Sequence, residues 1–199
     1  MARKTSHPTR ERLIDTMTGL LDEKAPEAII VDEVLAVSGI SKGSLYHHFE
    51  DFSDLLEMAY LRRFAAFVDA SSASIAEVIA TSTSRDEMLT RLREITRRTQ
   101  SPELASVRLE RVRAIMLAGG NERFRVRLAV EQQRLTDALA DLVRESQAKG
   151  WFSSDFPPHV VAVFVQAYTL GRVLDEIAES PVDNEQWVAF IDHVLAASL

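Results

Sequence analysis

Residues 39–49 hold the groups in this sequence that are best suited to binding a polyanion. They read Gly-Ile-Ser-Lys-Gly-Ser-Leu-Tyr-His-His-Phe, and no acidic residue lies between Glu33 and Glu50. Phosphate oxygens accept hydrogen bonds from N–H, O–H and ammonium donors, and base edges in a DNA groove bind the same kinds of group. A short helix that presents Lys42, Tyr46 and His47 is therefore typical of a surface that binds DNA.

Neighbouring helices must position this stretch. Gly39 predicts the left-handed end of a short helix that begins near Asp32, and Ser41 is a good N-cap for the next helix, 42–49. A first helix over 8–24 carries one apolar stripe, made of Leu13, Ile14, Met17, Leu20 and Leu21. Three short helices, the last two joined by a glycine turn, indicate helix-turn-helix organisation. Leu45 and Phe49 are expected in its core.

The rest of the sequence predicts further helices and no strand. Ser53 is expected to cap a long fourth helix, and Ser84 with Glu87 forms a capping box for a fifth. Pro102, a Gly-Gly-Asn stop at 119–121, Gly150 and Ser180-Pro181 separate the later helices. Asp183 with Gln186 is expected to cap the last helix. We predict an all-α chain of about nine helices, the later ones near 102–120, 121–149, 155–179 and 183–199.

Composition limits the function classes. The 199 residues are 46% hydrophobic and 27% charged, with a net charge of −7 and no cysteine. This composition favours a globular protein, excludes disulfides and thiolate chemistry, and argues against a general polyanion binder. Neither a signal peptide nor a membrane span is predicted, so we expect a cytoplasmic protein that does not enter a membrane.

The sequence lacks the arrangements that an all-helical enzyme would need. The five histidines are scattered, and there is no His-Glu-x-x-His pattern or glycine-rich phosphate loop. His47 and His48 are adjacent, so on a helix they point about 100° apart and do not suit a shared metal. We expect no enzymatic activity, no metal and no cofactor.

The stretch from Thr9 to Leu56 resembles the DNA-binding domain of the TetR family of bacterial transcriptional regulators. Residues 38–49, Ser-Gly-Ile-Ser-Lys-Gly-Ser-Leu-Tyr-His-His-Phe, are similar to the family's signature through the turn and recognition helix, and Leu55-Leu56 fits the start of its connecting helix. The resemblance implies a DNA-binding domain over 1–52, with its motif at about 31–50, and a ligand-binding and dimerisation domain over 53–199. It implies DNA contacts from Ser41, Lys42, Gly43, Ser44, Tyr46, His47, His48 and Arg10.

The chain departs from the family pattern at two informative positions. Where a Ser or Thr commonly opens the second helix the chain has Ile30, and we expect Asp32 to cap that helix instead. Phe52 stands where the family often has a lysine that touches phosphate. Arg3, Lys4 and Arg10 form either a DNA-binding arm or a tail with incidental charge.

The resemblance further implies a homodimeric repressor that a small molecule releases from a palindromic operator. A ligand-independent regulator or an activator on the same scaffold is the alternative. Apolar residues expected around the ligand are Phe64, Phe67, Ile95, Met116, Phe124, Leu128, Phe164 and Tyr168, although the same stripes would also suit a plain core. Their apolar character favours a hydrophobic or amphipathic ligand.

Residues 85–134 are rich in arginine and carry a net charge of +5. We interpret the arginines as a solvated face paired with acids, while one of them could reach a ligand cavity. These are Arg91, Arg93, Arg97, Arg98, Arg108, Arg111, Arg113, Arg123, Arg125 and Arg127.

The last two predicted helices are apolar on more than one side. A surface helix needs only one apolar stripe, so a second stripe favours a partner, and we predict a four-helix bundle between two copies of the chain. A fully buried monomer core is the alternative. The predicted interface residues are Val161, Phe164, Val165, Gly171, Leu174, Trp187, Ile191, Val194 and Leu195.

Overall fold

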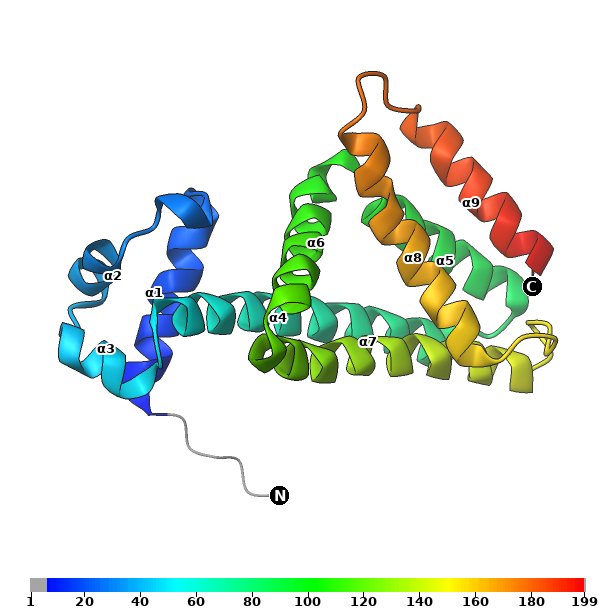
Figure 1. The fold of residues 1–199 in the computed structure, drawn as a ribbon. Coiled ribbons are helices and arrows are strands. Elements are labelled where there is room, and N and C mark those ends of the chain that lie inside the picture. Colours follow the sequence, from blue (N-terminus) through cyan, green and yellow to red (C-terminus); the bar gives the residue numbers. More distant parts are fainter. Residues whose placement is uncertain (1–6, 199) are drawn as a thin grey trace. The chain divides into compact units, whose positions relative to one another are not determined.

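The computed structural model describes residues 7–198, and no strand occurs in this range (Figure 1). The all-α prediction is confirmed. Short 3-10 turns cover Pro26–Ala28 and Pro102–Leu104. The α-helices are α1 (Pro8–Glu23), α2 (Val31–Ser38), α3 (Lys42–His48), α4 (Phe52–Thr81), α5 (Arg85–Thr99), α6 (Ala105–Gly120), α7 (Glu122–Ala148), α8 (Pro158–Glu176) and α9 (Asn184–Ser198).

The chain forms two compact units, one ending at Ala66 and the other beginning at Phe67. The sequence placed the domain boundary earlier, between residues 52 and 53. The difference arises because the first turns of α4 belong to the first core, where Leu55 and Ala59 are fully buried. A boundary at the start of α4 would separate these side chains from the residues they pack against.

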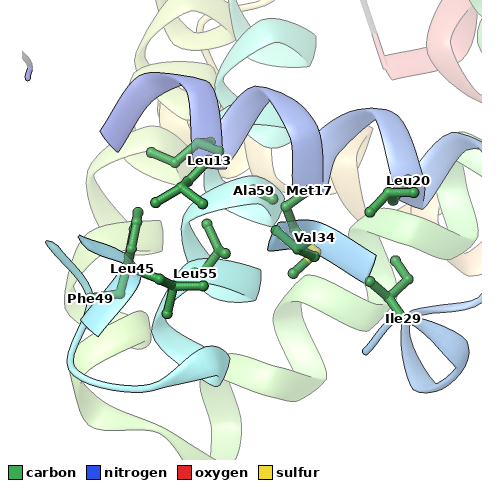
Figure 2. Close-up of a cluster of buried hydrophobic side chains, with 10 residues drawn as sticks. Leu13, Met17, Leu20, Ile29, Val34, Leu45, Phe49, Leu55 and Ala59 are labelled. Atoms are coloured by element: carbon green, nitrogen blue, oxygen red, sulfur yellow. The ribbon is translucent and has the colours of Figure 1, made fainter. Parts of the chain in front are cut away.

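The core of the first unit draws on all four of its helices (Figure 2). Leu13 and Met17 of α1 pack with Val34 of α2, Leu45 of α3 and Leu55 of α4, and each of the five is fully buried. Burying a side chain of this size contributes about 1.5–3 kcal/mol. The expected core positions Leu45 and Phe49 are buried, so one side of α3 is fixed in this core.

Two predicted N-caps are wrong in this unit. Asp51, and not Ser53, caps α4, because its carboxylate accepts a hydrogen bond from the Asp54 N–H at 2.7 Å. The Asp54 carboxylate in turn accepts from the Glu50 N–H at 3.2 Å. At α2 the N-cap position is Ile30 and no side chain caps the helix; Asp32 lies within its first turn. In both cases the N-cap position lies two residues earlier than predicted.

In the second unit α7 packs along α8 and α6, and α5 lies against α9. A core of Ile75, Val78, Met88, Leu142, Val143 and Phe152 joins α4, α5, α7 and the loop that follows α7. Two predicted helix starts of this unit agree with the structure: Ser84 accepts from the Glu87 N–H at 3.2 Å, and Asp183 accepts from the Gln186 N–H at 3.0 Å. Two others lie three residues later than predicted, because α6 begins at Ala105 and α8 begins at Pro158.

Helix α4 bears on the expectation that the chain has no membrane span. Among the described residues it is the one helix long and apolar enough to cross a membrane by length and composition. Such a single helix is weak evidence, because the core helix of a soluble protein passes the same test. Val68, Ile75 and Val78 of α4 are buried, as in a core helix.

Candidate DNA-binding surface and ligand cavity

The turn between α2 and α3 is built by three short-range interactions. Gly39 adopts the left-handed conformation, with φ 67° and ψ 21°, and its N–H bonds the Leu35 carbonyl at 2.9 Å. Ser38 is buried, and its hydroxyl accepts from the Ile40 N–H at 3.3 Å. Ser41 caps α3 by accepting from the Ser44 N–H, also at 3.3 Å. The turn therefore fixes where α3 begins and which way it faces.

Helix α3 presents its polar residues on the side opposite its core contacts. Ser41, Lys42, Gly43, Tyr46 and His47 are exposed, and 45% of the Tyr46 surface is open to solvent. Ser44 and His48 are half-buried. The predicted DNA-binding residues of this helix thus lie together on one surface, with an ammonium, hydroxyls and imidazoles as hydrogen-bonding groups.

Arg10 and three histidines extend this surface toward the start of α1. The His48 ring lies 4.6 Å from the His7 ring and 5.1 Å from the His47 ring, measured between centroids. Burial, His7, His47 and Arg10 together lower the pKa of His48. The Arg10 guanidinium lies over Phe49, 5.3 Å from the ring centroid. Arg10 therefore joins the α3 surface, while Arg3 and Lys4 lie outside the described residues.

Phe52 cannot make the phosphate contact that the resemblance assigns to a lysine at this position. It is partly buried and packs against the core of the first unit. Any phosphate contact near the start of α4 must come from another group.

The second unit contains a cavity of about 150 Å³. All of its helices contribute to the wall, which is mostly apolar. The lining consists of Phe67, Ser71, Ser74, Ile75, Leu92, Ile95, Thr96, Arg98, Thr99, Arg111, Leu135, Leu139, Leu142, Val143, Phe152, Val161, Ala162, Val165, Gln166, Tyr168, Thr169 and Leu195.

Three of the eight residues predicted to surround a ligand line this cavity: Phe67, Ile95 and Tyr168. The other five lie elsewhere. Phe64, Phe124 and Leu128 are buried but do not line the cavity, while Met116 and Phe164 are 72% and 44% exposed. The stripes indicated apolar positions on each helix, but the rotation of a helix decides which of its positions line a cavity.

The arginine-rich segment divides into surface and interior residues. Arg91 and Arg125 form local pairs with Glu87 and Glu122, as interpreted from the sequence. For Arg108 and Arg111 the expected solvated face is wrong, since they are only 2% and 4% exposed.

The two buried arginines have different surroundings. Arg108 binds the Glu176 carboxylate and donates to the carbonyls of Thr99 and Ser101 at 2.5 and 2.9 Å. Arg111 lines the cavity, with its guanidinium 4.3 Å from the centroid of the Phe67 ring. Glu176, the residue that neutralises Arg108, lies 68 positions further along the chain.

Comparison with solved structures identifies the fold. GusR from Salmonella enterica is 19% identical, with a TM-score of 0.71 and 99% of each chain covered. A protein from a Rhodococcus species described as a TetR-family transcriptional regulator is 22% identical, with a TM-score of 0.66, over 96% of this chain and 99% of its own. A similarly described protein from Mesorhizobium loti is 15% identical, with a TM-score of 0.71, over 99% and 98%. No protein-family model and no curated protein sequence matches the chain.

The chain has the TetR-family fold. Within this TetR fold, α8 carries an outward apolar stripe opposite the cavity. Val160, Val163, Phe164 and Leu174 are between 44% and 76% exposed, and Ala167 lies between them on the same side. These positions recur at helical spacing, so they form one continuous face.

The outward face of α8 includes only some of the residues predicted to form the dimer interface. Of the nine predicted residues, Phe164 and Leu174 are exposed on it, and Gly171 is half-buried at its centre. Val161, Val165 and Leu195 line the cavity instead. Ile191 is buried within the chain, Val194 is half-buried, and the indole N–H of the half-buried Trp187 donates to Gln100 at 2.9 Å.

Proposed function

We propose that the chain is a TetR-family member that acts in the cytoplasm as a homodimeric, DNA-binding transcriptional regulator, most simply as a repressor. The observation that carries this proposal is α3, whose Lys42, Tyr46 and His47 are exposed while Leu45 holds the opposite side in a core. The similarity of fold over the whole described chain supports it. The proposed DNA contacts are Ser41, Lys42, Gly43, Ser44, Tyr46, His47, His48 and Arg10.

A dimer is required because one short recognition helix contacts too few base pairs to select a site. Helix-turn-helix proteins solve this by placing two recognition helices in successive major grooves, about 34–36 Å apart. The outward stripe of α8 supports a second copy as the partner, since exposed Leu174 and Phe164 would gain stability when covered. Half-buried Gly171 lies on the same stripe and allows close helix approach.

The cavity of the second unit supports regulation by a small hydrophobic or amphipathic ligand. A ligand that binds one conformation of the dimer better than another shifts the population toward it. If the favoured conformation places the two α3 helices at an unsuitable separation, the ligand releases the operator. A ligand-independent regulator or an activator on the same scaffold is the second candidate, and it predicts that no ligand changes DNA affinity.

Selection of binding sites from random duplex DNA with the purified full-length protein tests the proposal. We expect enrichment of a palindrome with half-site centres about 10–10.5 base pairs, or a multiple of that, apart. The Lys42→Ala variant should fail to enrich it, whereas Lys149→Ala, which removes a lysine of the second unit that packs on Trp151, should enrich it normally. A wild-type protein that is dimeric but enriches no sequence would refute the proposal.

A further inference from the structure

The charges that line the cavity are all of one sign. Among the lining residues, all of which lie in the described part of the chain, Arg98 and Arg111 are charged and no Asp or Glu is present. Arg98 is exposed and donates to the Ser74 hydroxyl at 3.3 Å, so it lies where the cavity opens to solvent. Arg111 lies inside. An apolar cavity with only cationic charges favours a ligand that is apolar with a negative group.

Arg111 is held inside the protein with its charge intact. Its residue is 4% exposed, and the guanidinium packs 4.3 Å from the centroid of Phe67. Burial lowers the pKa of Arg111 to about 10, which still leaves it protonated at neutral pH. An anion that enters the cavity beside Arg111 meets a positive charge in a medium of low dielectric constant, where the attraction between the two is strong.

The uncharged polar groups of the wall are largely engaged with the protein. The Gln166 amide accepts from Gln132 at 2.5 Å and donates to Thr136 at 3.1 Å. The hydroxyls of Thr99 and Thr169 donate to main-chain carbonyls of their own helices at 3.1 and 2.8 Å. Among the lining residues, Arg111 is the charged donor that lies inside the cavity, and a guanidinium has five N–H groups.

The size of the cavity limits the apolar part of the ligand. An apolar cavity of about 150 Å³ is large enough to hold benzene. The space in this structure is of that order, so it suits one aromatic ring or a short acyl chain. A phosphate dianion would bring two charges to a wall with one interior cation, whereas a carboxylate matches it in charge and in planar geometry.

We propose that the effector is a small apolar carboxylic acid whose carboxylate is bound by Arg111 and whose ring or chain packs among Leu139, Leu142 and Val165. This inference rests on the proposed ligand-responsive function and names the chemical class of its ligand. Specificity follows because a carboxylate can form a bidentate ion pair with the guanidinium, whereas an amide accepts through one neutral oxygen and an ammonium group cannot accept.

Calorimetric titration of the full-length protein with three probes tests the inference. The probes are benzoate, benzamide and benzylamine, which share one aromatic ring and differ in the polar group. We expect wild-type protein to bind the acid about 10- to 100-fold more tightly than the amide, since hydrogen bonds to charged groups are the stronger class. The amine should bind most weakly.

Substitution of Arg111 tests whether this side chain causes the preference for the acid over the amide. Arg111→Met keeps an apolar stem of similar length and should reduce acid affinity to near that of the amide, while amide affinity falls much less. Arg97→Met is the matched control, because Arg97 is 60% exposed, pairs with Glu185 and does not line the cavity. Far-UV circular dichroism shows whether each variant is folded. The comparison of acid with amide on wild-type protein tests the inference even if a variant does not fold.

The outcomes separate this inference from the proposed function. If the amide or amine bound wild-type protein as tightly as the acid and released DNA, the carboxylate inference would fail while ligand-responsive regulation stood. Retention of the acid preference in Arg111→Met would also overturn it. If no probe bound and none released DNA, the carboxylate inference would fail. Sequence-specific DNA binding by the same preparation would still support the proposal that the protein is a DNA-binding regulator.

Discussion

Lys42 provides the sharpest test of how the first unit binds DNA. It is exposed on the first turn of α3, and in the described part of the chain no carboxylate lies within ion-pair distance of its ammonium. Its charge is therefore available to a phosphate. Replacing Lys42 by alanine should weaken operator binding and, more specifically, make the remaining binding less sensitive to salt, because fewer counterions are released.

The magnitude of the salt effect follows from the dimer. Each neutralised phosphate contributes about 0.9 to the slope of log affinity against log salt concentration, and a homodimer carries two Lys42 side chains. The slope should therefore become shallower by about 1.8 in Lys42→Ala. Between roughly 50 and 200 mM salt, a slope change of this size makes the penalty of the substitution shrink by about 10-fold.

Fluorescence anisotropy titrations of the selected operator at several KCl concentrations measure this slope. Sedimentation analysis should show the same dimer for wild type and variant, since Lys42 is remote in sequence from α8 and α9. The reasoning would be refuted if Lys42→Ala kept the wild-type slope, or if the control Lys149→Ala lowered the slope equally.

Three further predictions concern stability and assembly. Gly39→Ala places a side chain at φ 67° and should lower the free energy of unfolding by about 1 kcal/mol in urea titrations, whereas Gly19→Ala in the middle of α1 should raise it by about 0.5–1 kcal/mol. Burial and the neighbouring His7, His47 and Arg10 lower the pKa of His48 in the folded state, so the unfolded chain binds more protons as the pH falls through the ordinary range of histidine. The unfolding free energy should therefore fall between about pH 7.5 and 5.5, and by less in His48→Gln. If the unfolding free energy fell equally in His48→Gln, the pH dependence would come from a group other than His48. Leu174→Asp should convert the proposed dimer to a monomer in sedimentation analysis, while Val126→Asp, at another exposed apolar position on α7, should not.

Features whose partners lie within one turn of each other could be predicted from the sequence. Gly39 and Ser41 were identified correctly because a left-handed glycine and a capping hydroxyl act on residues two to four positions away. The cap of α4 was missed for a reason that is not local. Asp51 and Ser53 are both acceptable caps, and the choice depends on Phe52, which packs against the first core as the first residue of the helix.

The surroundings of the arginines and the cavity could not be predicted in this way. Whether Arg108 is solvated depends on Glu176, which α8 brings to it across 68 positions. A stripe of apolar residues shows which side of a helix is buried, but not which of several neighbours it meets. Phe124 and Ile95 therefore look equivalent in the sequence, although only Ile95 reaches the cavity.

Helix α8 links the two proposed activities of the second unit. Its inner side contributes Val161, Val165 and Tyr168 to the cavity, and its outer side carries the exposed stripe proposed to meet a second copy. The Phe164 ring on the outer side contacts the Tyr168 ring on the inner side, with centroids 5.8 Å apart. A ligand that displaces Tyr168 must therefore move a side chain of the proposed interface. The two proposals together account for the two apolar sides of α8, and under them a ligand would act on dimer geometry through a single helix rather than through a long path in the protein.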